Sequence, residues 1–77
     1  MPTVLRLRGF DFLIYTHDHE PAHVHVWRDG NSVIIAIHDQ PSVRRNEGMR
    51  TRDIAVAKAI VEDNLEHLRK EWRRIHG

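Results

Sequence analysis

Four of the seven histidines of this 77-residue chain lie in one ten-residue segment, HDHEPAHVHV. They are His17, His19, His23 and His25. An unperturbed imidazole has a pKa of about 6.5, so it gains and loses a proton within the physiological range. Such a cluster could transfer protons, bind a metal ion or stack on a nucleobase. Which of these it does depends on the elements that position the histidines.

Four segments rich in Val, Ile, Leu, Phe and Tyr predict β-strands over residues 3–7, 10–16, 22–28 and 32–38. Arg8-Gly9 separates the first two segments and Asp29-Gly30 separates the last two. Such dipeptides favour two-residue hairpin turns. A longer connection, residues 17–21, joins the middle pair. The simplest topology is an antiparallel meander.

The turns also set the register of the strands. They place His25 opposite Ile34 and Leu13, and Leu7 opposite Phe10. Because side chains alternate across a strand, one face becomes entirely apolar and the other carries the histidines. The predicted apolar face is Leu5, Leu7, Phe10, Phe12, Ile14, Val24, Val26, Val33, Ile35 and Ile37.

The last third of the chain predicts one long helix over residues 51–76, after a loop over residues 39–50. Thr51 is the expected N-cap. Apolar residues recur every three or four positions and form a stripe that should cover the apolar sheet face. The stripe is Ile54, Ala57, Val61, Leu65, Leu68, Trp72 and Ile75, while Val56 and Ile60 fall outside it.

The predicted fold is therefore α+β: a four-stranded antiparallel meander packed on one long C-terminal helix. We expect a single domain over residues 1–77, with the meander in residues 1–38. Cysteine is absent, which excludes disulfides and thiolate metal ligands, and the net charge is only +1. No apolar run is long enough for a membrane span or signal peptide, so we expect a soluble cytoplasmic protein.

His23 and His25 are the candidate catalytic pair, because alternation puts both rings on one face. Tyr15, expected opposite His23, would orient a substrate, and Arg6 or Arg8 would bind a phosphate. These groups suit metal-free RNA cleavage, in which one imidazole takes the 2′-hydroxyl proton and the other protonates the leaving oxygen.

Further residues are candidates for binding rather than catalysis. His19 lies in the connection before the histidine strand, and Trp27 follows His25 in the same row. Arg44 and Arg45 begin a basic segment that could contact the phosphates of RNA.

Two other interpretations stay open. The histidine face could be a protein-interaction surface, for a homodimer or another partner, because Leu13, Ile34 and Ala36 also lie on it. It could also belong to a metal-binding regulator, with His23, His25 and one of three further histidines as ligands and an acidic residue as oxygen donor. The further histidines are His17, His19 and His38, and the acidic residue is Asp18 or Glu20. The loop histidines have no fixed geometry, so no residue is assigned as a metal ligand and no cofactor is expected.

The first half of the chain resembles a small bacterial family known as domain of unknown function 4160. The resemblance implies that the protein is encoded beside a small partner and is a component of a toxin–antitoxin-like pair, with an antitoxin-like partner. It points to His19, His23 and His25 as positions to test, and less to His17. Ala22 departs from the pattern, where a second proline is common. The residues that carry it are Met1, Pro2, Thr3, Phe10, Phe12, Ile14, Tyr15, Asp18, His19, Pro21, His23, Val24, His25 and Val26.

Overall fold

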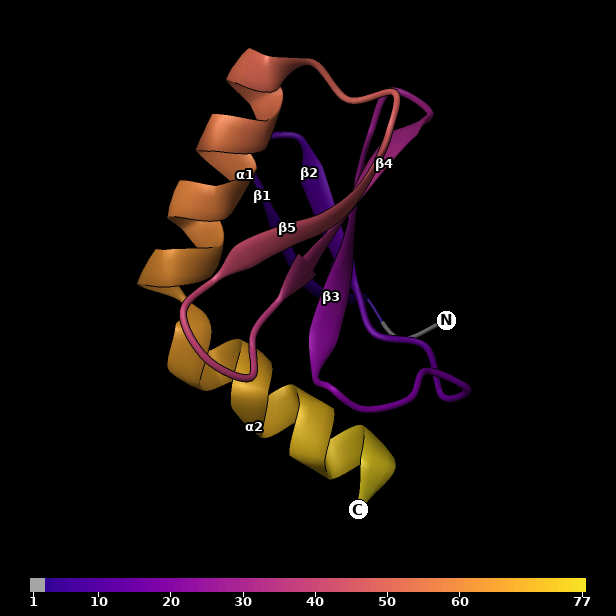
Figure 1. Ribbon diagram of the computed structural model, residues 1–77. Coiled ribbons are helices and arrows are strands. Elements are labelled where there is room, and N and C mark those ends of the chain that lie inside the picture. The colour runs from indigo at the N-terminus through magenta and orange to yellow at the C-terminus, as the bar shows by residue number, and fades with distance from the viewer. Residues whose placement is uncertain (1–2) are drawn as a thin grey trace.

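The computed structural model describes residues 3–77, so Met1 and Pro2 of the family resemblance lie outside the described residues. Within this range the chain forms five strands followed by two helices (Figure 1). They are β1 (Thr3–Leu7), β2 (Phe10–Leu13), β3 (His23–Arg28), β4 (Asn31–Ala36), β5 (Ser42–Glu47), α1 (Thr51–Asp63) and α2 (Leu65–His76).

The strands form one antiparallel meander in the order β1-β2-β3-β4-β5. The predicted registers are confirmed where the strands pair: Leu7 pairs with Phe10, and His25 pairs with both Leu13 and Ile34. The expected pairing of Tyr15 with His23 was wrong, because β2 ends at Leu13 and the Tyr15 ring contacts His25 instead. The confirmed registers hold because each hairpin turn places two successive residues at positive φ, as a type I′ turn requires. These φ values are 55° and 82° in the Arg8-Gly9 turn, and 50° and 81° in the Asp29-Gly30 turn.

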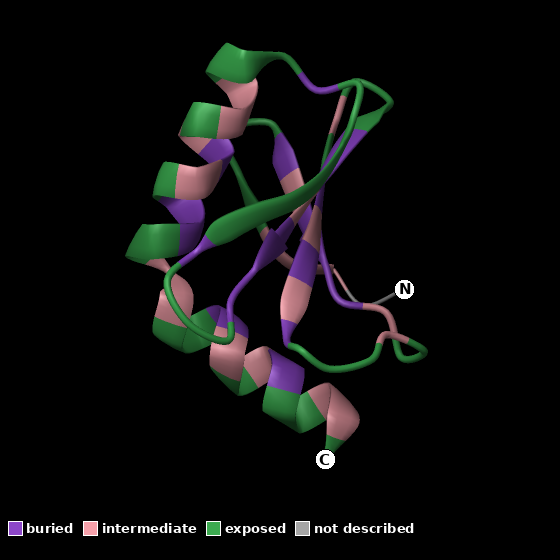
Figure 2. Ribbon diagram, in the orientation of Figure 1, coloured by how far each residue is buried: buried purple, intermediate pink, exposed green. Residues whose placement is uncertain are grey.

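The prediction of four strands was wrong, because part of the expected loop 39–50 forms β5. This strand pairs with β4 through its backbone at the edge of the sheet. All six of its residues are exposed (Figure 2), so its sequence SVRRNE lacks the apolar alternation that marks a half-buried strand. The segment 10–16 is also shorter than expected, since its strand ends at Leu13.

The prediction of one long helix was also wrong, because the helix is interrupted at Asn64. Asn64 has φ −118° and ψ 22°, and its side-chain Nδ2 donates a hydrogen bond of 2.8 Å to the Ile60 carbonyl. An asparagine amide competes in this way with the backbone pattern of a helix. At the other end, Arg50 occupies the N-cap instead of Thr51 and makes no side-chain capping bond.

Both helices pack against the apolar face of the sheet (Figures 1 and 2). Every member of the predicted helical stripe is buried in this core or packed against it, and so are Val56 and Ile60. Leu7 is the exception on the sheet, at 44 % exposed, because it ends the edge strand β1 beside a turn. The strand residues of the core are Phe10, Phe12, Val24, Val26, Val33 and Ile35, each at most 1 % exposed.

Two apolar residues of the histidine face are buried within the chain as well. Leu13 is 5 % exposed and Ala36 is 0 % exposed, while Ile34 is half-buried. They therefore offer little of the exposed apolar surface on which the protein-interaction interpretation depended. In the part of the chain that is described, neither helix has the length and apolar character that crossing a membrane would require.

Candidate functional site

His23 and His25 project from the outer face of β3, and the valines between and after them point into the core. Both histidines are half-buried, whereas Val24 and Val26 are 0 % exposed. The two imidazole rings meet edge to face with their centroids 5.2 Å apart. The predicted side-by-side placement of the pair is therefore present, and the core residues on either side of His25 fix the backbone that carries it.

Asp18 lies between the two histidines, although it comes from the preceding loop. A tight turn positions it: its backbone N–H donates to the Tyr15 carbonyl at 3.1 Å, and its carboxylate accepts the Tyr15 N–H at 3.0 Å. The carboxylate oxygens lie 3.2 Å from Nε2 of His25, and one of them lies 3.5 Å from Nε2 of His23.

The pKa of the Asp18 carboxyl lies below its usual value. Burial opposes ionisation and is the largest single influence. It is outweighed by the Tyr15 N–H, the hydrogen bond to His25 and the charges of His25 and His23 taken together. Asp18 is therefore a carboxylate over the whole physiological range and presents negative charge to both imidazoles.

The Pro21 carbonyl fixes which nitrogen of His23 is available. This oxygen lies 2.9 Å from Nδ1 of His23, and a carbonyl oxygen can only accept a hydrogen bond. Nδ1 therefore carries a proton, and in the neutral ring Nε2 carries the lone pair. The peptide bond between Glu20 and Pro21 is cis, and it lies in the turn that positions the Pro21 carbonyl.

Asp18, His23 and His25 each direct one potential ligand atom to the same point. These three atoms all lie within 4.8 Å of one another, and the three side chains are only 14–18 % exposed. Imidazole nitrogens and a carboxylate oxygen are ligands that Zn²⁺ and related divalent ions take in proteins. The same atoms also form a histidine–carboxylate pair of the kind used in acid–base catalysis.

A continuous series of aromatic rings connects this cluster with α2. Tyr15 contacts His25 at a centroid distance of 4.6 Å, and His23 contacts Trp72 at 5.3 Å. Trp72 stacks on His76 at 3.9 Å. The indole N–H of Trp72 donates to the Glu20 carboxylate at 3.0 Å, which ties the helix to the loop that carries Asp18.

The predicted binding residues fall into separate places. His19 and Arg44 line a hollow of about 210 Å³ beside His23. Trp27 and Arg6 line a second hollow of about 260 Å³, together with Tyr15.

Two predicted arginines are not brought to the histidines. Arg8 sits in the first hairpin turn, where its backbone carbonyl accepts a bond from Arg28, and Arg45 pairs with Glu47 along β5. His17 and His38, considered as further metal ligands, are exposed and outside the cluster.

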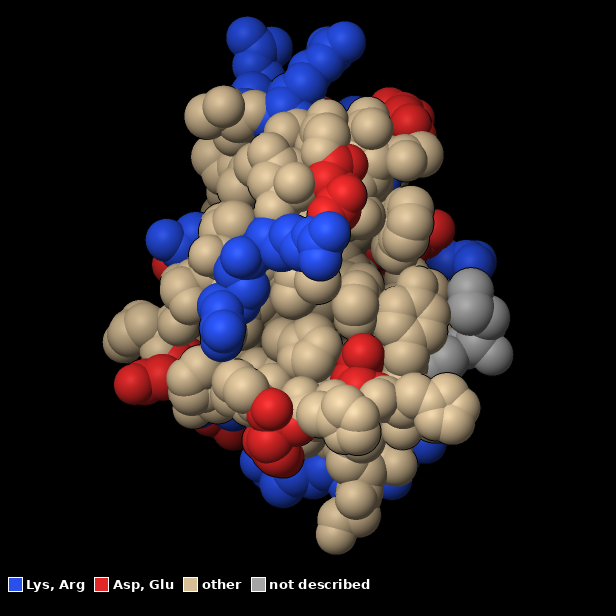
Figure 3. Space-filling model, turned by 45° about the vertical axis from the view of Figure 1, so that its right-hand side comes forward, with Lys and Arg blue, Asp and Glu red and all other residues tan. Residues whose placement is uncertain are grey.

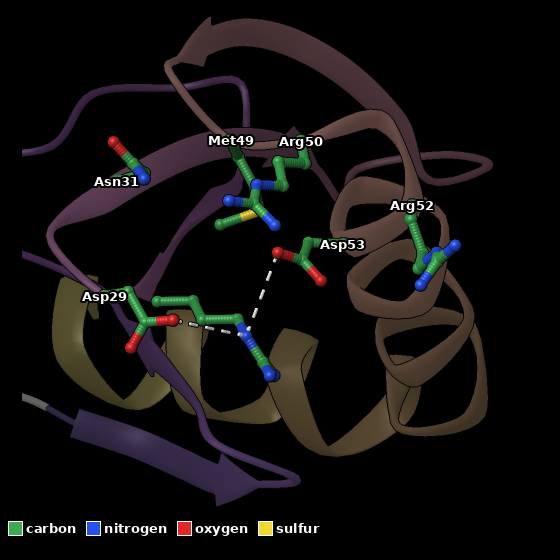
Figure 4. Close-up of a pocket in the computed structure, with 7 residues that line it drawn as sticks. Asp29, Asn31, Met49, Arg50, Arg52 and Asp53 are labelled. Carbon is green, nitrogen blue, oxygen red and sulfur yellow. Dashed lines mark ion pairs between the residues drawn. The ribbon is translucent and has the colours of Figure 1, made fainter.

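A cavity of about 590 Å³ lies at the opposite end of β3 (Figure 4). None of the predicted site residues lines it. Its Arg28 side chain lies 3.8 Å from carboxylate oxygens of both Asp29 and Asp53, and 4.8 Å from the centre of the Phe10 ring. These contacts join the second hairpin to the start of α1, so Arg28 has a structural role there.

Sequence reasoning underestimated three residues. Asp18 was only one of two alternative oxygen donors, and Trp72 was expected solely in the core. Glu20 was likewise considered only as a ligand. The available signal was an acidic residue in the short loop directly before a His-x-His strand, since such a loop must return close to that strand.

A family model described as "Domain of unknown function (DUF4160)" matches residues 9–73 of the chain. The match covers the chain from β2 to α1, including the histidine cluster, and most of α2, while β1 lies outside it. No curated protein and no solved structure matches the chain.

Proposed function

Because this chain belongs to the family described as a domain of unknown function (DUF4160), we propose its function from the site itself: Asp18, His23 and His25 bind one divalent transition-metal ion. The observation that carries the proposal is the convergence of three ligand atoms within 4.8 Å of one another. Two imidazole nitrogens and one carboxylate oxygen suit Zn²⁺ or Fe²⁺ in particular.

The hydrogen bonds of His23 favour a cation at this point. Its Nδ1 donates to the Pro21 carbonyl, so the lone pair of the neutral ring on Nε2 faces an Asp18 oxygen 3.5 Å away. Two acceptors facing each other repel unless a proton or a metal ion lies between them. A backbone carbonyl that holds the second nitrogen of a ligating histidine is also the usual outer support of a metal site.

Three protein ligands leave part of the coordination sphere of such an ion open. Structural zinc sites usually take four protein ligands, whereas catalytic sites keep a position for water or substrate. The partial exposure of the three side chains agrees with an accessible ion. We therefore propose a site for an exchangeable ligand rather than a purely structural ion.

Zinc titration by calorimetry, on protein freed of metal with a chelator, tests this proposal. We expect one ion per chain, and loss of that heat in Asp18→Asn, His23→Ala and His25→Ala. His19→Ala is the matched control, because it removes an imidazole of the same loop that lies outside the cluster. Retention of the heat in Asp18→Asn, or its loss in His19→Ala, would contradict the proposed ligand set.

Thermal unfolding gives a second measurement. Ligand at 100 times its Kd adds about 2.7 kcal/mol to the stability of the folded state. In a domain of this size about 1 kcal/mol corresponds to 4–8 °C in Tm, so saturating zinc should raise Tm by roughly 10–20 °C. The three ligand variants should show no such increase while remaining folded by circular dichroism.

The bond of 3.2 Å between His25 and Asp18 favours a second candidate function, metal-independent RNA cleavage by His23 and His25. Asp18 would orient His25, and the two imidazoles would exchange protons with the 2′-hydroxyl and the leaving oxygen. This candidate predicts cleavage in EDTA with 2′,3′-cyclic phosphate ends, lost in either histidine variant. Cleavage that requires added zinc supports the metal site instead.

The toxin–antitoxin-like pair is proposed on the family resemblance. It predicts that expression of the chain inhibits growth, and that the product of the adjacent gene binds it and relieves the inhibition. His23→Ala/His25→Ala should abolish inhibition while the fold survives. Normal growth on expression of the unmodified protein would count against a toxin.

A further inference from the structure

The outer face of the sheet carries the histidine row, and the helices pack mainly on the other face (Figure 1). Only the His23 end of the row contacts a helix, through Trp72 of α2. Along β3 the row is His23, His25 and Trp27, and Trp27 is 39 % exposed. At about 3.3 Å per residue the row extends roughly 13 Å. It is therefore an elongated strip of rings on a rigid strand rather than a single pocket.

Two hollows flank this strip on opposite sides of β3. The one of about 260 Å³ lies toward β1 and β2, and Arg6, Tyr15 and Trp27 line it. The one of about 210 Å³ lies toward β4 and β5, and His23 and Arg44 line it. The two hollows share no residue. Each combines aromatic rings with one arginine and one carboxylate, which is Asp11 in the first and Glu20 in the second.

Two arginines on this side are accessible to the phosphates of a polyanion. Figure 3 shows mostly uncharged side chains on this side, with basic side chains in the middle and at the top and with acidic side chains among them. Arg6 pairs with Asp11 at 3.3 Å, but with 74 % of its side chain exposed it stays accessible to a phosphate. Arg44 is exposed and, within residues 3–77, has no carboxylate at ion-pair distance.

We propose that this outer sheet face binds single-stranded RNA. Bases stack on Trp27 and Tyr15, and phosphates contact Arg6 on one side of the row and Arg44 on the other. Exposed aromatic side chains on an open sheet beside arginines are the means by which single strands are bound with little sequence preference. Duplex RNA, whose bases are already stacked, cannot use the rings in this way.

This inference extends the proposed RNA-cleavage function, and the choice of RNA as the ligand rests on that proposal. Binding itself requires neither the metal ion nor cleavage. It can therefore be measured in EDTA with a 2′-O-methylated strand of about 12 nucleotides, comparable to the footprint of one small binding domain. Such a strand keeps its bases and phosphates but cannot be cleaved through its 2′-oxygen. Failure of the metal or cleavage proposals leaves this measurement unaffected.

Fluorescence anisotropy with this strand tests the stacking. Trp27→Ala should weaken binding about 5- to 150-fold, the loss expected for one stacked base. Leu7→Ala is the matched control. Leu7 is similarly exposed, at 44 %, but belongs to the face of the sheet opposite to Trp27, because it pairs with the core residue Phe10. The duplex of the same sequence should bind more weakly than the single strand. Equal binding of duplex and single strand, or unchanged affinity in Trp27→Ala, would overturn the proposal.

Salt dependence tests the two arginines. Each phosphate contact to a single strand contributes about −0.7 to the slope of log K against log salt concentration. Arg6→Gln and Arg44→Gln should each reduce the slope by about that amount, whereas Arg52→Gln, an exposed arginine on α1, should leave it unchanged. Equal slopes in all three variants refute the proposed contacts. A dimer in solution that Trp27→Ala dissociates, with no effect on RNA binding, would identify the face as an interface between copies instead.

Discussion

The hydrogen bond between the Trp72 indole and the Glu20 carboxylate should hold the loop of Asp18 against α2. It is 3.0 Å long and partly buried. A hydrogen bond to a charged group contributes about 1.5–3 kcal/mol, and because Glu20 is an exposed residue we expect the lower end. Glu20→Ala should then lower Tm by roughly 6–12 °C in a domain of this size.

A double-mutant cycle with Trp72→Phe isolates this bond from the rest of the tryptophan. Trp72→Phe alone also removes part of a ring that is only 4 % exposed, so its single cost exceeds the value of the bond. The coupling free energy between Glu20→Ala and Trp72→Phe, measured by urea unfolding, should be about 1–1.5 kcal/mol. Zinc should also bind more weakly to Glu20→Ala, because Asp18 loses the support of its loop.

Glu66→Ala is the control, because this carboxylate on the same helix is 91 % exposed. Its coupling to Trp72→Phe should be zero within error. A coupling for Glu20 that lies within about 0.5 kcal/mol of zero, the usual error of additivity, would refute the reasoning. The loop would then be held by its own turn and not by α2.

The remaining predictions concern the core, one turn and the acid stability. Leu68→Ala, at a fully buried position, should cost about 3–5 kcal/mol in urea unfolding, and a cost below about 1 kcal/mol would contradict its place in the core. Gly48→Ala should destabilise more than Gly30→Ala, since both have positive φ but only at Gly48 would the new Cβ lie 2.8 Å from the Asn31 side chain; equal melting temperatures would refute that contact. Because the pKa of Asp18 is lowered on folding, its contribution to stability is fully present above the ordinary value of 3.8 and is lost as the pH falls through the lowered pKa. Asp18→Asn should therefore flatten the acid branch of the stability curve below pH 3.8, and an unchanged branch would argue against the interaction with the histidines.

The hairpins could be predicted because their information is local. Arg8-Gly9 and Asp29-Gly30 fix two turns, and the turns fix the strand register. This register directs Val24 and Val26 into the core. The edge strand β5 carried no such signal, since backbone pairing alone holds it. The break at Asn64 depends on one side-chain hydrogen bond within an otherwise continuous apolar stripe. Hydrophobic periodicity gives no indication of such a bond.

The candidate site was predicted only as far as it lies on a regular strand. Side-chain alternation along β3 places His23 and His25 on the same face, independently of the conformation of the preceding loop. The position of Asp18 depends on a turn closed by Tyr15 and on a chain reversal before Pro21, for which the sequence supplies no register. Trp72 reaches His23 only because α2 continues past the break in the helix, which residue spacing could not show.

The ring series from Tyr15 to His76 also gives the molecule an optical reporter. Trp72 lies 5.3 Å from His23 and 3.9 Å from His76, so its indole emission responds to what either imidazole binds. The other tryptophan, Trp27, can be replaced by phenylalanine to leave Trp72 as the sole tryptophan. Events at the histidine cluster can then be followed in real time without any attached dye.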